Sequence, residues 1–480
     1  MKSIFLELAM IGIVEKIHKR IGKVGVFEFS PLAEEESYVQ SGFSFAHNRG
    51  AGPTRWAGAA TAPCQCAGKA NLSKTGYKQS GTPNSSPYEP EGYLGDKQAM
   101  EDICRSTLFH TDRSLCYAEI LSPFEVRARI KVAVLKFLAI LNSPDPALSD
   151  LNLINRKSNN SHFRRGLLSE VSSISLYHSF CTRSFRKPND AKAFIRVWQV
   201  MEQCLRLLVQ EKQATQRELF YKLLCDSPEY FDSQAQVNKT VQDVVALLRC
   251  CRHSLGIIAS SRGAVIGRLL LQEPNQEVVD CSVLGPSGYA ICGDLSLVKE
   301  LVLQSDARYI IVVEKDAVFQ RLAEDHIYNQ IPCILLTAKG YPDLATRMLL
   351  HQMSRCFPNI PVLALVDWNP SGLAILCTYK YGSTRMGLEA YRYACSVKWL
   401  GLQGDDLELV HQNSFIPLKQ RDLQIAKSLQ SYEVLQEVYK IELMKMVERG
   451  HRAEIEALYY HGFDFLAKYV IKKIVQSDYI

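Results

Sequence analysis

Apolar residues recur every three or four positions between about residues 114 and 250, which predicts helices. Such a pattern follows Pro123 in PFEVRARIKVAVLKFLAIL and returns over about Ala191–Glu211. In QVNKTVQDVVALLRC the apolar positions fall at i, i+4, i+7, i+8 and i+11, which is one face of a helix. Two strand-like runs follow, LGIIASS and AVIGRLLLQ, on either side of a turn at Arg262-Gly263. Helix, helix and β-hairpin predict a winged helix (CAP-like), a fold that binds DNA or, in many cases, only protein.

From Arg308 the pattern changes to short apolar runs alternating with helices. RYIIVV, IPCILLT and PVLALV are typical of buried strands, and LATRMLLHQMSR is typical of a helix between two of them. This alternation predicts a parallel α/β sheet, followed by a largely helical remainder. The fold class is therefore multi-domain α/β, with an N-terminal helical region (114–190), a winged-helix domain (191–285) and a parallel α/β domain with C-terminal helices (300–480).

The N-terminal sequence is rich in Gly, Ser, Pro, Ala and Asn from about residue 28 to 100, so residues 1–113 are predicted to be a disordered leader. It is either a real extension or a translated non-coding stretch. The first twenty residues predict a short amphipathic helix, because Glu7 interrupts the apolar run and no small-residue cleavage site follows. The longest apolar runs elsewhere are far too short to span a bilayer, so no membrane partner is expected.

Composition adds little to this assignment. The formal charge of +6, from 56 basic and 50 acidic residues, is a mild bias toward polyanions and does not by itself indicate nucleic acid. The 15 cysteines are scattered without zinc-site spacing, which favours buried thiols in a reducing compartment.

Tyr221 is a candidate nucleophile in TQRELFYKLL, residues 215–224. The apolar stripe of this predicted helix consists of Leu219, Phe220, Leu223 and Leu224. Tyr221 points roughly 130° away from that stripe, and Arg217 lies one helical turn before it. Taken alone, this is an ordinary tyrosine at a helix edge. A phenol that must attack a phosphodiester, however, cannot lie in the core, and a neighbouring guanidinium can steady the phosphate or the developing phenolate.

Two carboxylates follow predicted parallel strands. Glu314 ends RYIIVV, and Asp367 follows PVLALV. The structural alternatives are a solvated strand end for Glu314 and a helix N-cap for Asp367. The functional alternative is a Mg²⁺ site at the carboxyl edge of the sheet, where oxygen ligands can hold the ion beside a phosphoryl group.

Five separate motifs of the chain resemble those of a known protein family. QRELFYK, SSRG, VVEKD, TAKGYPDLATR and LVDWNPSG occur in the order found in the A-type chain of topoisomerase VI and its eukaryotic meiotic relatives, over about residues 114–480. The stretches RELFYKLLCDSPEYF and KIVQSDYI look like those of plant meiotic members of this family. The resemblance implies a catalytic winged helix joined to a Toprim domain.

Site residues and partners follow from the resemblance. It implies a nucleophilic Tyr221 with Arg217 beside it, DNA contacts by Arg262 and Lys339, and Mg²⁺ ligands at Glu314, Asp367 and Asn369. Asn369 departs from the family, which commonly has Asp there. Its amide oxygen can ligate a metal but brings no charge. The missing charge should weaken metal binding, and it leaves undecided whether a second Mg²⁺ ion binds. The implied partners are double-stranded DNA, a second copy or a meiotic paralogue, and an ATPase-like B-type subunit bound near Cys116–Leu141, all in the nucleus.

Three functions fit these residues. The first is a transesterase that makes meiotic double-strand breaks and stays on the 5′ ends. The second is a non-catalytic DNA-binding or scaffold paralogue, favoured by Asn369. The third is a component of a resealing topoisomerase. Because the sequence has no Gly-x-x-x-x-Gly-Lys-Ser/Thr loop, strand passage would need a separate ATPase chain.

Overall fold

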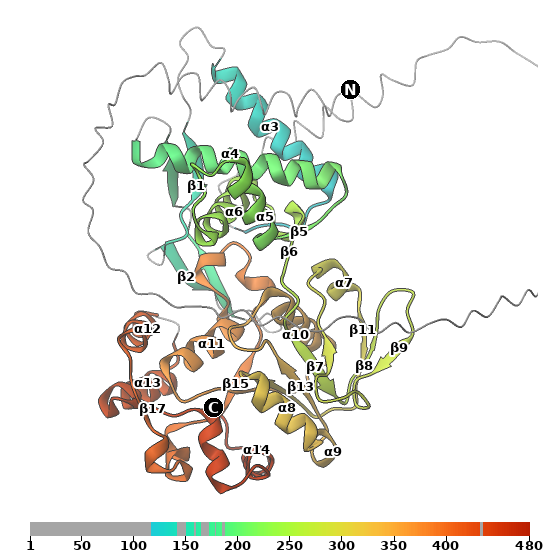
Figure 1. The fold of residues 1–480 in the computed structure, drawn as a ribbon, viewed down its shortest axis with the longest axis vertical. Coiled ribbons are helices and arrows are strands. Elements are labelled where there is room, and N and C mark those ends of the chain that lie inside the picture. The colour runs from blue at the N-terminus through green and yellow to red at the C-terminus, as the bar shows by residue number, and fades with distance from the viewer. Residues whose placement is uncertain are drawn as a thin grey trace, which may run out of the picture.

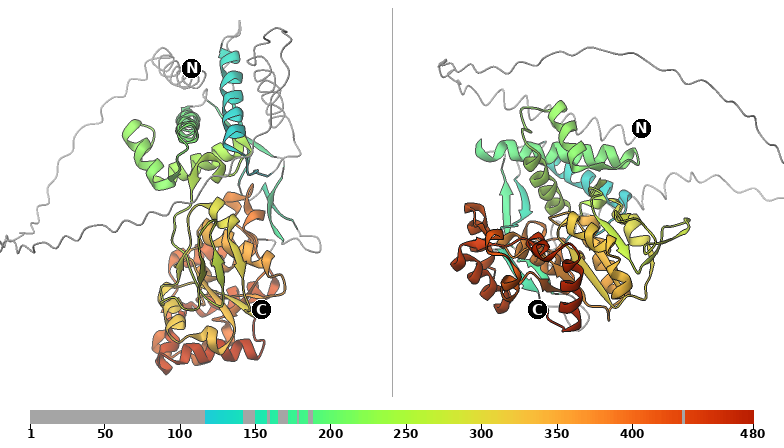
Figure 2. Two further views of the ribbon diagram at one scale, coloured as in Figure 1. Left: turned by 90° about the vertical axis from the view of Figure 1, so that its right-hand side faces the viewer. Right: turned by 60° about the horizontal axis from the view of Figure 1, so that its bottom comes forward.

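The molecule consists of two units stacked along its long axis (Figures 1 and 2). The upper unit in Figure 1 contains helices α3 to α6, and the lower unit contains a large sheet with helices around it. The computed structural model describes residues 117–141, 150–157, 160–164, 172–177, 179–184, 188–432 and 435–480. The predicted leader, including the short helix in its first twenty residues, lies outside these ranges.

The helices of the upper unit lie where the apolar periodicity predicts them. Their bounds are α3 (Pro123–Leu141), α4 (Pro188–Val209), α5 (Gln216–Asp226) and α6 (Gln234–Leu248). The predicted apolar face of α6 is confirmed, because each of its residues is fully buried: Val237, Val241, Val244, Val245 and Leu248. In the same core, the rings of Phe137 and Trp198 lie 5.0 Å apart and join α3 to α4.

The region predicted as helical, 114–190, is only partly so. After α3 it forms the short antiparallel pairs β1–β4 and β2–β3. Their bounds are β1 (Leu151–Ile154), β2 (Ser161–Arg164), β3 (Ser173–Leu176) and β4 (Phe180–Arg183). Strands of four residues in a polar sequence have no periodic signal, so the pattern missed them. The pair β1–β4 covers α6 and buries Asp243, which accepts hydrogen bonds from Arg156 and Arg183.

The β-hairpin predicted for residues 255–272 does not form, so the winged-helix prediction is wrong in its wing. Ile257–Ile258 (β6) pairs in parallel with Ala214–Thr215 (β5), just before α5. Ala264–Gly267 (β7) instead enters the lower unit and pairs with strands of the large sheet. All of β7 is buried. A short apolar run fits a central strand as well as a hairpin, and here the central strand forms.

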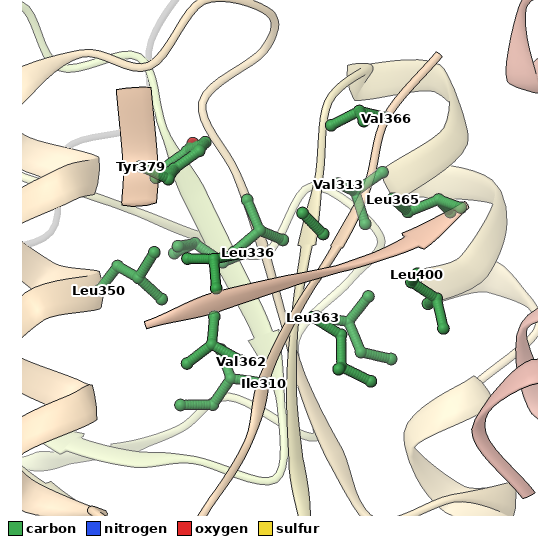
Figure 3. Packing of buried hydrophobic residues seen from close by; sticks show 14 of the residues in the cluster. Ile310, Val313, Leu336, Leu350, Val362, Leu363, Leu365, Val366, Tyr379 and Leu400 are labelled. Carbon is green, nitrogen blue, oxygen red and sulfur yellow. The ribbon is translucent and has the colours of Figure 1, made fainter. Parts of the chain in front are cut away.

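The lower unit is built on a six-stranded sheet with the order β10-β7-β13-β12-β14-β15. β13, β12 and β14 are parallel, as predicted, and β15 joins them in parallel from a region predicted as largely helical, whereas β7 and β10 form an antiparallel edge. The strands not yet bounded are β10 (Tyr289–Ala290), β12 (Tyr309–Val313), β13 (Cys333–Thr337), β14 (Val362–Leu365) and β15 (Val397–Gly401). Figure 3 shows how Ile310, Leu336 and Leu363 pack in its core. The parallel strands bring their carboxyl ends to one edge.

Helices and small sheets complete the lower unit. The helices are α7 (Leu295–Glu300), α8 (Asp316–Glu324), α9 (Ile327–Gln330), α10 (Leu344–Cys356), α11 (Pro370–Tyr381), α12 (Gln420–Gln430), α13 (Glu437–Arg449) and α14 (Phe465–Val475). The remaining strands are β8 (Leu270–Gln272), β9 (Val278–Asp280), β11 (Val302–Gln304), β16 (Ile416–Pro417) and β17 (His451–Arg452). No helix in the described part of the chain is long and apolar enough to cross a membrane. The cysteines described are free thiols, most of them buried.

Candidate active site

Helix α5 begins at a capping box that fixes its first turn. The Glu218 N–H donates to Thr215 Oγ1 at 3.2 Å, and the Thr215 N–H donates to Glu218 Oε2 at 2.6 Å. These bonds lower the pKa of the Glu218 carboxyl. A cap of this kind stabilises a helix by about 1 kcal/mol. Leu219 and Leu223 are buried against the upper core, so the opposite edge of α5 is held in a fixed direction.

Tyr221 lies on that opposite edge, as predicted, with half of its surface (50%) exposed. Arg217 Nη2 donates to its hydroxyl at 3.4 Å, and the guanidinium carbon lies 5.7 Å from the ring centroid. The ring also packs against Phe220. The phenol is thus open to a bound molecule and has a permanent positive charge beside it, which favours an anionic group such as a phosphodiester.

Glu314 and Asp367 come together at the carboxyl edge of the large sheet. They follow the neighbouring parallel strands β12 and β14. Glu314 Oε2 accepts from the Asp367 N–H at 2.9 Å, and Asp367 Oδ1 accepts from the Ile455 N–H at 2.9 Å. Asp367 is almost fully buried. The alternative of a solvated strand end for Glu314 does not hold, because its carboxylate is bonded to the next strand's backbone.

Burial raises the pKa of both carboxyls. It brings the pKa of Glu314 to about 8, with repulsion from Asp367 as the second cause. It brings the pKa of Asp367 to about 6, although Lys315 and the Ile455 N–H act in the opposite direction. At neutral pH Glu314 is therefore mostly protonated, whereas Asp367 is mostly ionised. A bound divalent cation would favour the ionised form of both carboxyls.

Lys315, Glu454 and Glu456 surround the pair and were missed by sequence reasoning. Lys315 Nζ lies 3.2 Å from Asp367 Oδ2 and 2.9 Å from Glu454 Oε2, and it also bonds Glu456. Burial lowers the pKa of Lys315, but these carboxylates outweigh it and raise the pKa above its usual range. Lys315 follows Glu314 directly in VVEKD and could have been proposed. The two glutamates lie far along the chain and had no signal.

Asn369 caps helix α11 in this structure. Its Oδ1 accepts from the Gly372 N–H at 2.7 Å, and Pro370 takes the first helical position. Its Nδ2 lies 3.5 Å from Asp367 Oδ2. The structure thus brings Asn369 next to Asp367, but with its nitrogen toward the carboxylate. The capping role considered for Asp367 belongs to Asn369.

Arg262 and Lys339 lie on the lower unit, at the same edge of the sheet. Arg262 is exposed, and its Nη2 donates to the Tyr341 carbonyl at 3.1 Å. Lys339 follows β13 in a left-handed conformation (φ 56°), with its Nζ 3.4 Å from Asp316 Oδ2. The loop is tied to the end of β12, because the N–H of Gly340 donates to the main-chain carbonyl of Glu314 at 2.8 Å.

The donor set fits Mg²⁺. This ion is commonly held by one or two carboxylates, with waters and phosphate oxygens completing the shell. Glu314 and Asp367 supply two such carboxylates, and burial raises their pKa values, which a bound cation would lower. Among the residues that the structure describes, no three His, Cys, Asp or Glu side chains converge as a ready-made metal site. The fit therefore depends on this pair and on further ligands such as water or phosphate oxygens.

The tyrosine and the carboxylates belong to different units. In Figure 1, α5 lies among the upper helices, whereas β13 and α8 lie in the lower unit. Within the described part of the chain, no hydrogen bond or ring contact of Tyr221 reaches Glu314 or Asp367. The structure therefore assembles two half-sites: Tyr221 with Arg217, and Glu314 with Asp367 and Asn369.

Two family models match these two units. The Toprim domain of the topoisomerase 6 A-type chain and Spo11 matches residues 309–474, and the type IIB DNA topoisomerase family matches residues 192–257. Relatives that match over their full length agree with both assignments. The chain therefore belongs to the family that unites Spo11 with the A-type chain of topoisomerase VI.

Within that family, the chain is similar to meiotic recombination proteins of plants. It is 64% identical over 384 residues to meiotic recombination protein SPO11-2 of Oryza sativa subsp. indica, a match that covers 80% of this chain and 100% of the rice protein. It is 63% identical to SPO11-2 of Arabidopsis thaliana over 375 residues, which cover 78% and 98% of the two chains. The identity to the A-type chain of DNA topoisomerase 6 of Arabidopsis thaliana is 34% over 317 residues, 65% of this chain and 72% of that protein. The resemblance inferred from the motifs is confirmed.

Proposed function

We propose that this chain makes DNA double-strand breaks in meiosis by transesterification. The Tyr221 hydroxyl oxygen attacks a backbone phosphorus, and the bond from phosphorus to the 3′ oxygen breaks. A 5′-phosphotyrosyl bond forms, and the proton lost by the phenol is balanced by the one taken up at the leaving 3′-hydroxyl. The observation that carries the proposal is the half-exposed Tyr221 beside Arg217 on a capped helix, in a chain that matches the full length of a meiotic recombination protein.

Arg217 steadies the phosphate or the developing phenolate, because its charge persists at any physiological pH. Glu314 and Asp367 hold Mg²⁺, which when bound stabilises negative charge on the phosphoryl group. Asn369 does not add a charge there; its oxygen caps α11. Arg262 and Lys339, at the same edge, contact the DNA backbone. The Lys339 side chain is partly exposed and can exchange its salt bridge with Asp316 for a phosphate.

The unit of function is a dimer of this chain or a heterodimer with a meiotic paralogue, because one chain has one attacking tyrosine and two strands must be cut. Tyr221 of one protomer works with the Glu314–Asp367 pair of the other, consistent with the separation of the two half-sites within one chain. An ATPase-like B-type subunit binds the N-terminal helical region, where Ile120, Phe124 and Leu135 are exposed apolar side chains. The complex acts on double-stranded DNA in the nucleus.

The direct test is immunoprecipitation from meiotic cells under denaturing conditions. DNA that stays with the wild-type chain after denaturation, and is absent with Tyr221→Phe, supports the transesterase. Breaks at wild-type numbers with Tyr221→Phe would overturn the assignment of the nucleophile.

A non-catalytic paralogue is the second candidate, favoured by Asn369 in place of the usual acid. It predicts normal break numbers with Tyr221→Phe, but loss of breaks when the chain is deleted.

Site sharing is tested by mixing Tyr221→Phe and Glu314→Ala chains in one assembly. If sites are shared, one mixed site keeps both functional groups and the other loses both, so single-strand nicks appear. If each chain is self-contained, neither site is complete, and the assembled mixed dimer makes no nicks.

A further inference from the structure

The two units meet at a joint made of buried polar groups. The joint consists of residues 117–119, 249–252 and 388–393. The Ala118 N–H donates to the Leu388 carbonyl at 2.8 Å, and the Ala118 carbonyl accepts from Arg392 Nη2 at 3.1 Å. Glu389 is fully buried in this joint. One oxygen of its carboxylate accepts from the Arg252 N–H at 3.4 Å, and the other accepts from the Tyr393 hydroxyl at 3.3 Å.

Arg252 connects this joint to the tyrosine helix. Its Nη1 donates to Oε1 of Gln216 at 3.2 Å, and Gln216 is the first residue of α5. Arg252 is itself 9% exposed. Burial lowers its pKa, and the charge of Glu389 opposes that shift. A buried guanidinium needs compensation, so Arg252 is held between the lower unit and the start of α5.

On the side of the lower unit, the joint is connected through α10 to the edge of the sheet that carries Glu314 and Asp367. The Arg347 guanidinium on α10 lies 5.2 Å from the centroid of the Tyr393 ring. Helix α10 begins just after the loop of Lys339 and Tyr341, which is bonded to Glu314. A series of contacts therefore runs from the start of α5 to the element beside the metal half-site.

We propose that Arg252 is a positioning residue: through Gln216 it sets the direction in which α5 presents Tyr221 relative to the lower unit. This inference rests on the proposed transesterase function and deepens it. The capping box fixes where α5 begins, and Arg252 links that beginning to the lower unit, because its guanidinium contacts Gln216 while its N–H donates to Glu389. Because in-line attack tolerates little misplacement, loss of the contact slows covalent attachment without weakening DNA binding.

The test uses the mildest change, because replacing Arg252 would remove one of the two arginine charges that compensate the buried Glu389 and risk unfolding. Gln216→Ala removes the side chain that Arg252 holds. Gln203→Ala is the matched control: Gln203 Nε2 bonds Asp226 at the other end of α5, at 3.2 Å, from within the same unit. Gln216→Glu is the conservative variant, since its carboxylate can still accept from Arg252. Each variant is expressed as the full chain in meiotic cells, where covalently attached DNA is measured. DNA affinity is measured on the purified full chain.

We expect Gln216→Ala to lower covalently attached DNA per chain about tenfold, with DNA affinity unchanged within about twofold. Gln203→Ala and Gln216→Glu should both stay near wild type. Wild-type attachment by Gln216→Ala, or an equal loss with Gln203→Ala, would overturn the positioning role. If the wild-type chain itself attaches no DNA, the proposed function fails, and this inference fails with it; the first two outcomes overturn the inference alone.

Discussion

The tyrosine helix and the carboxylate edge are built in opposite ways. Tyr221 is half exposed at the edge of a short helix, and in the described part of the chain its hydrogen-bond and ring partners are Arg217 and Phe220. Asp367 is buried and Glu314 is half-buried at strand ends, where both are bonded to backbone N–H groups and surrounded by further charges. One half-site is open and simple, and the other is enclosed and crowded.

The difference shows where each half-site obtains its reactivity. The carboxylates acquire unusual pKa values from their own unit, so their affinity for a cation is a property of one chain. Neither Arg217 nor Phe220 offers Tyr221 a base, so the proposed function requires activation by what would bind against it: DNA, the ion and a facing protomer. The chain alone is therefore expected to bind metal but not to cleave.

The largest expected effect is that of Tyr221→Phe. Covalent DNA attachment should fall at least about a thousandfold, because the attacking oxygen is gone. Stability should change little, since the hydroxyl is exposed and its hydrogen-bond partner among the described residues is Arg217, at 3.4 Å. Thermal unfolding and DNA affinity serve as controls. If the Tyr221→Phe variant still attaches DNA covalently, another residue must be the nucleophile.

Glu314→Gln should lower the affinity for Mg²⁺ or Mn²⁺ by about a hundredfold, since it removes one of two charged ligands. Mn²⁺ binding followed by electron paramagnetic resonance measures this without DNA. Glu324→Gln, at the exposed end of α8, is the matched control and should bind as wild type. Equal Mn²⁺ affinities of the Glu314→Gln and Glu324→Gln variants would mean that the ion binds at another site.

The pH dependence of metal-free stability should expose the buried pair. The pKa of Glu314 is raised to about 8 in the folded chain, so the folded state holds its proton more tightly than the unfolded state does. Stability is therefore lost as pH rises from the unfolded pKa of about 4.5 toward 8. We expect a fall in the melting temperature of about 5 °C over this range that Glu314→Gln removes. A flat profile in the wild type would contradict the raised pKa of Glu314.

Asn369 separates capping from metal binding. Asn369→Asp keeps a capping oxygen and adds a charge beside Asp367, so Mg²⁺ should bind about tenfold more tightly. Asn369→Ser also keeps a cap and should leave metal affinity unchanged. Isothermal titration of Mg²⁺ compares the three chains. A lower affinity for Mg²⁺ in the Ser variant would show that the asparagine oxygen is a metal ligand.

The smallest expected effect is that of removing residues 1 to about 100. Their composition supplies no core, and the match to the rice relative covers 80% of this chain and all of that protein. A chain beginning near Ser114 should complement a null mutant. Failure at normal protein levels would mean that the leader binds a partner.

The sequence predicts those features of the structure that depend on residues close together along the chain, and it misses those that depend on residues far apart. Helix α6 and strands β12 to β14 have strong periodicity, and they form where expected. Tyr221 and Arg217 are one turn apart, so local geometry suffices to pair them. Glu454 and Glu456 meet Lys315 through a long-range approach that no local pattern encodes. The pairing of β7 with β13 is of the same kind, because a short apolar run does not specify its neighbour.

The crossing of β7 into the lower sheet has a consequence for synthesis. The ribosome releases β7 and β10 well before β13, the strand on which β7 pairs. Until β13 emerges, an apolar strand buried on both faces in the final fold has an unpaired edge. The upper unit can therefore close while the chain is still growing, but the lower one must wait. During that interval the nascent chain is most exposed to aggregation and most dependent on chaperones.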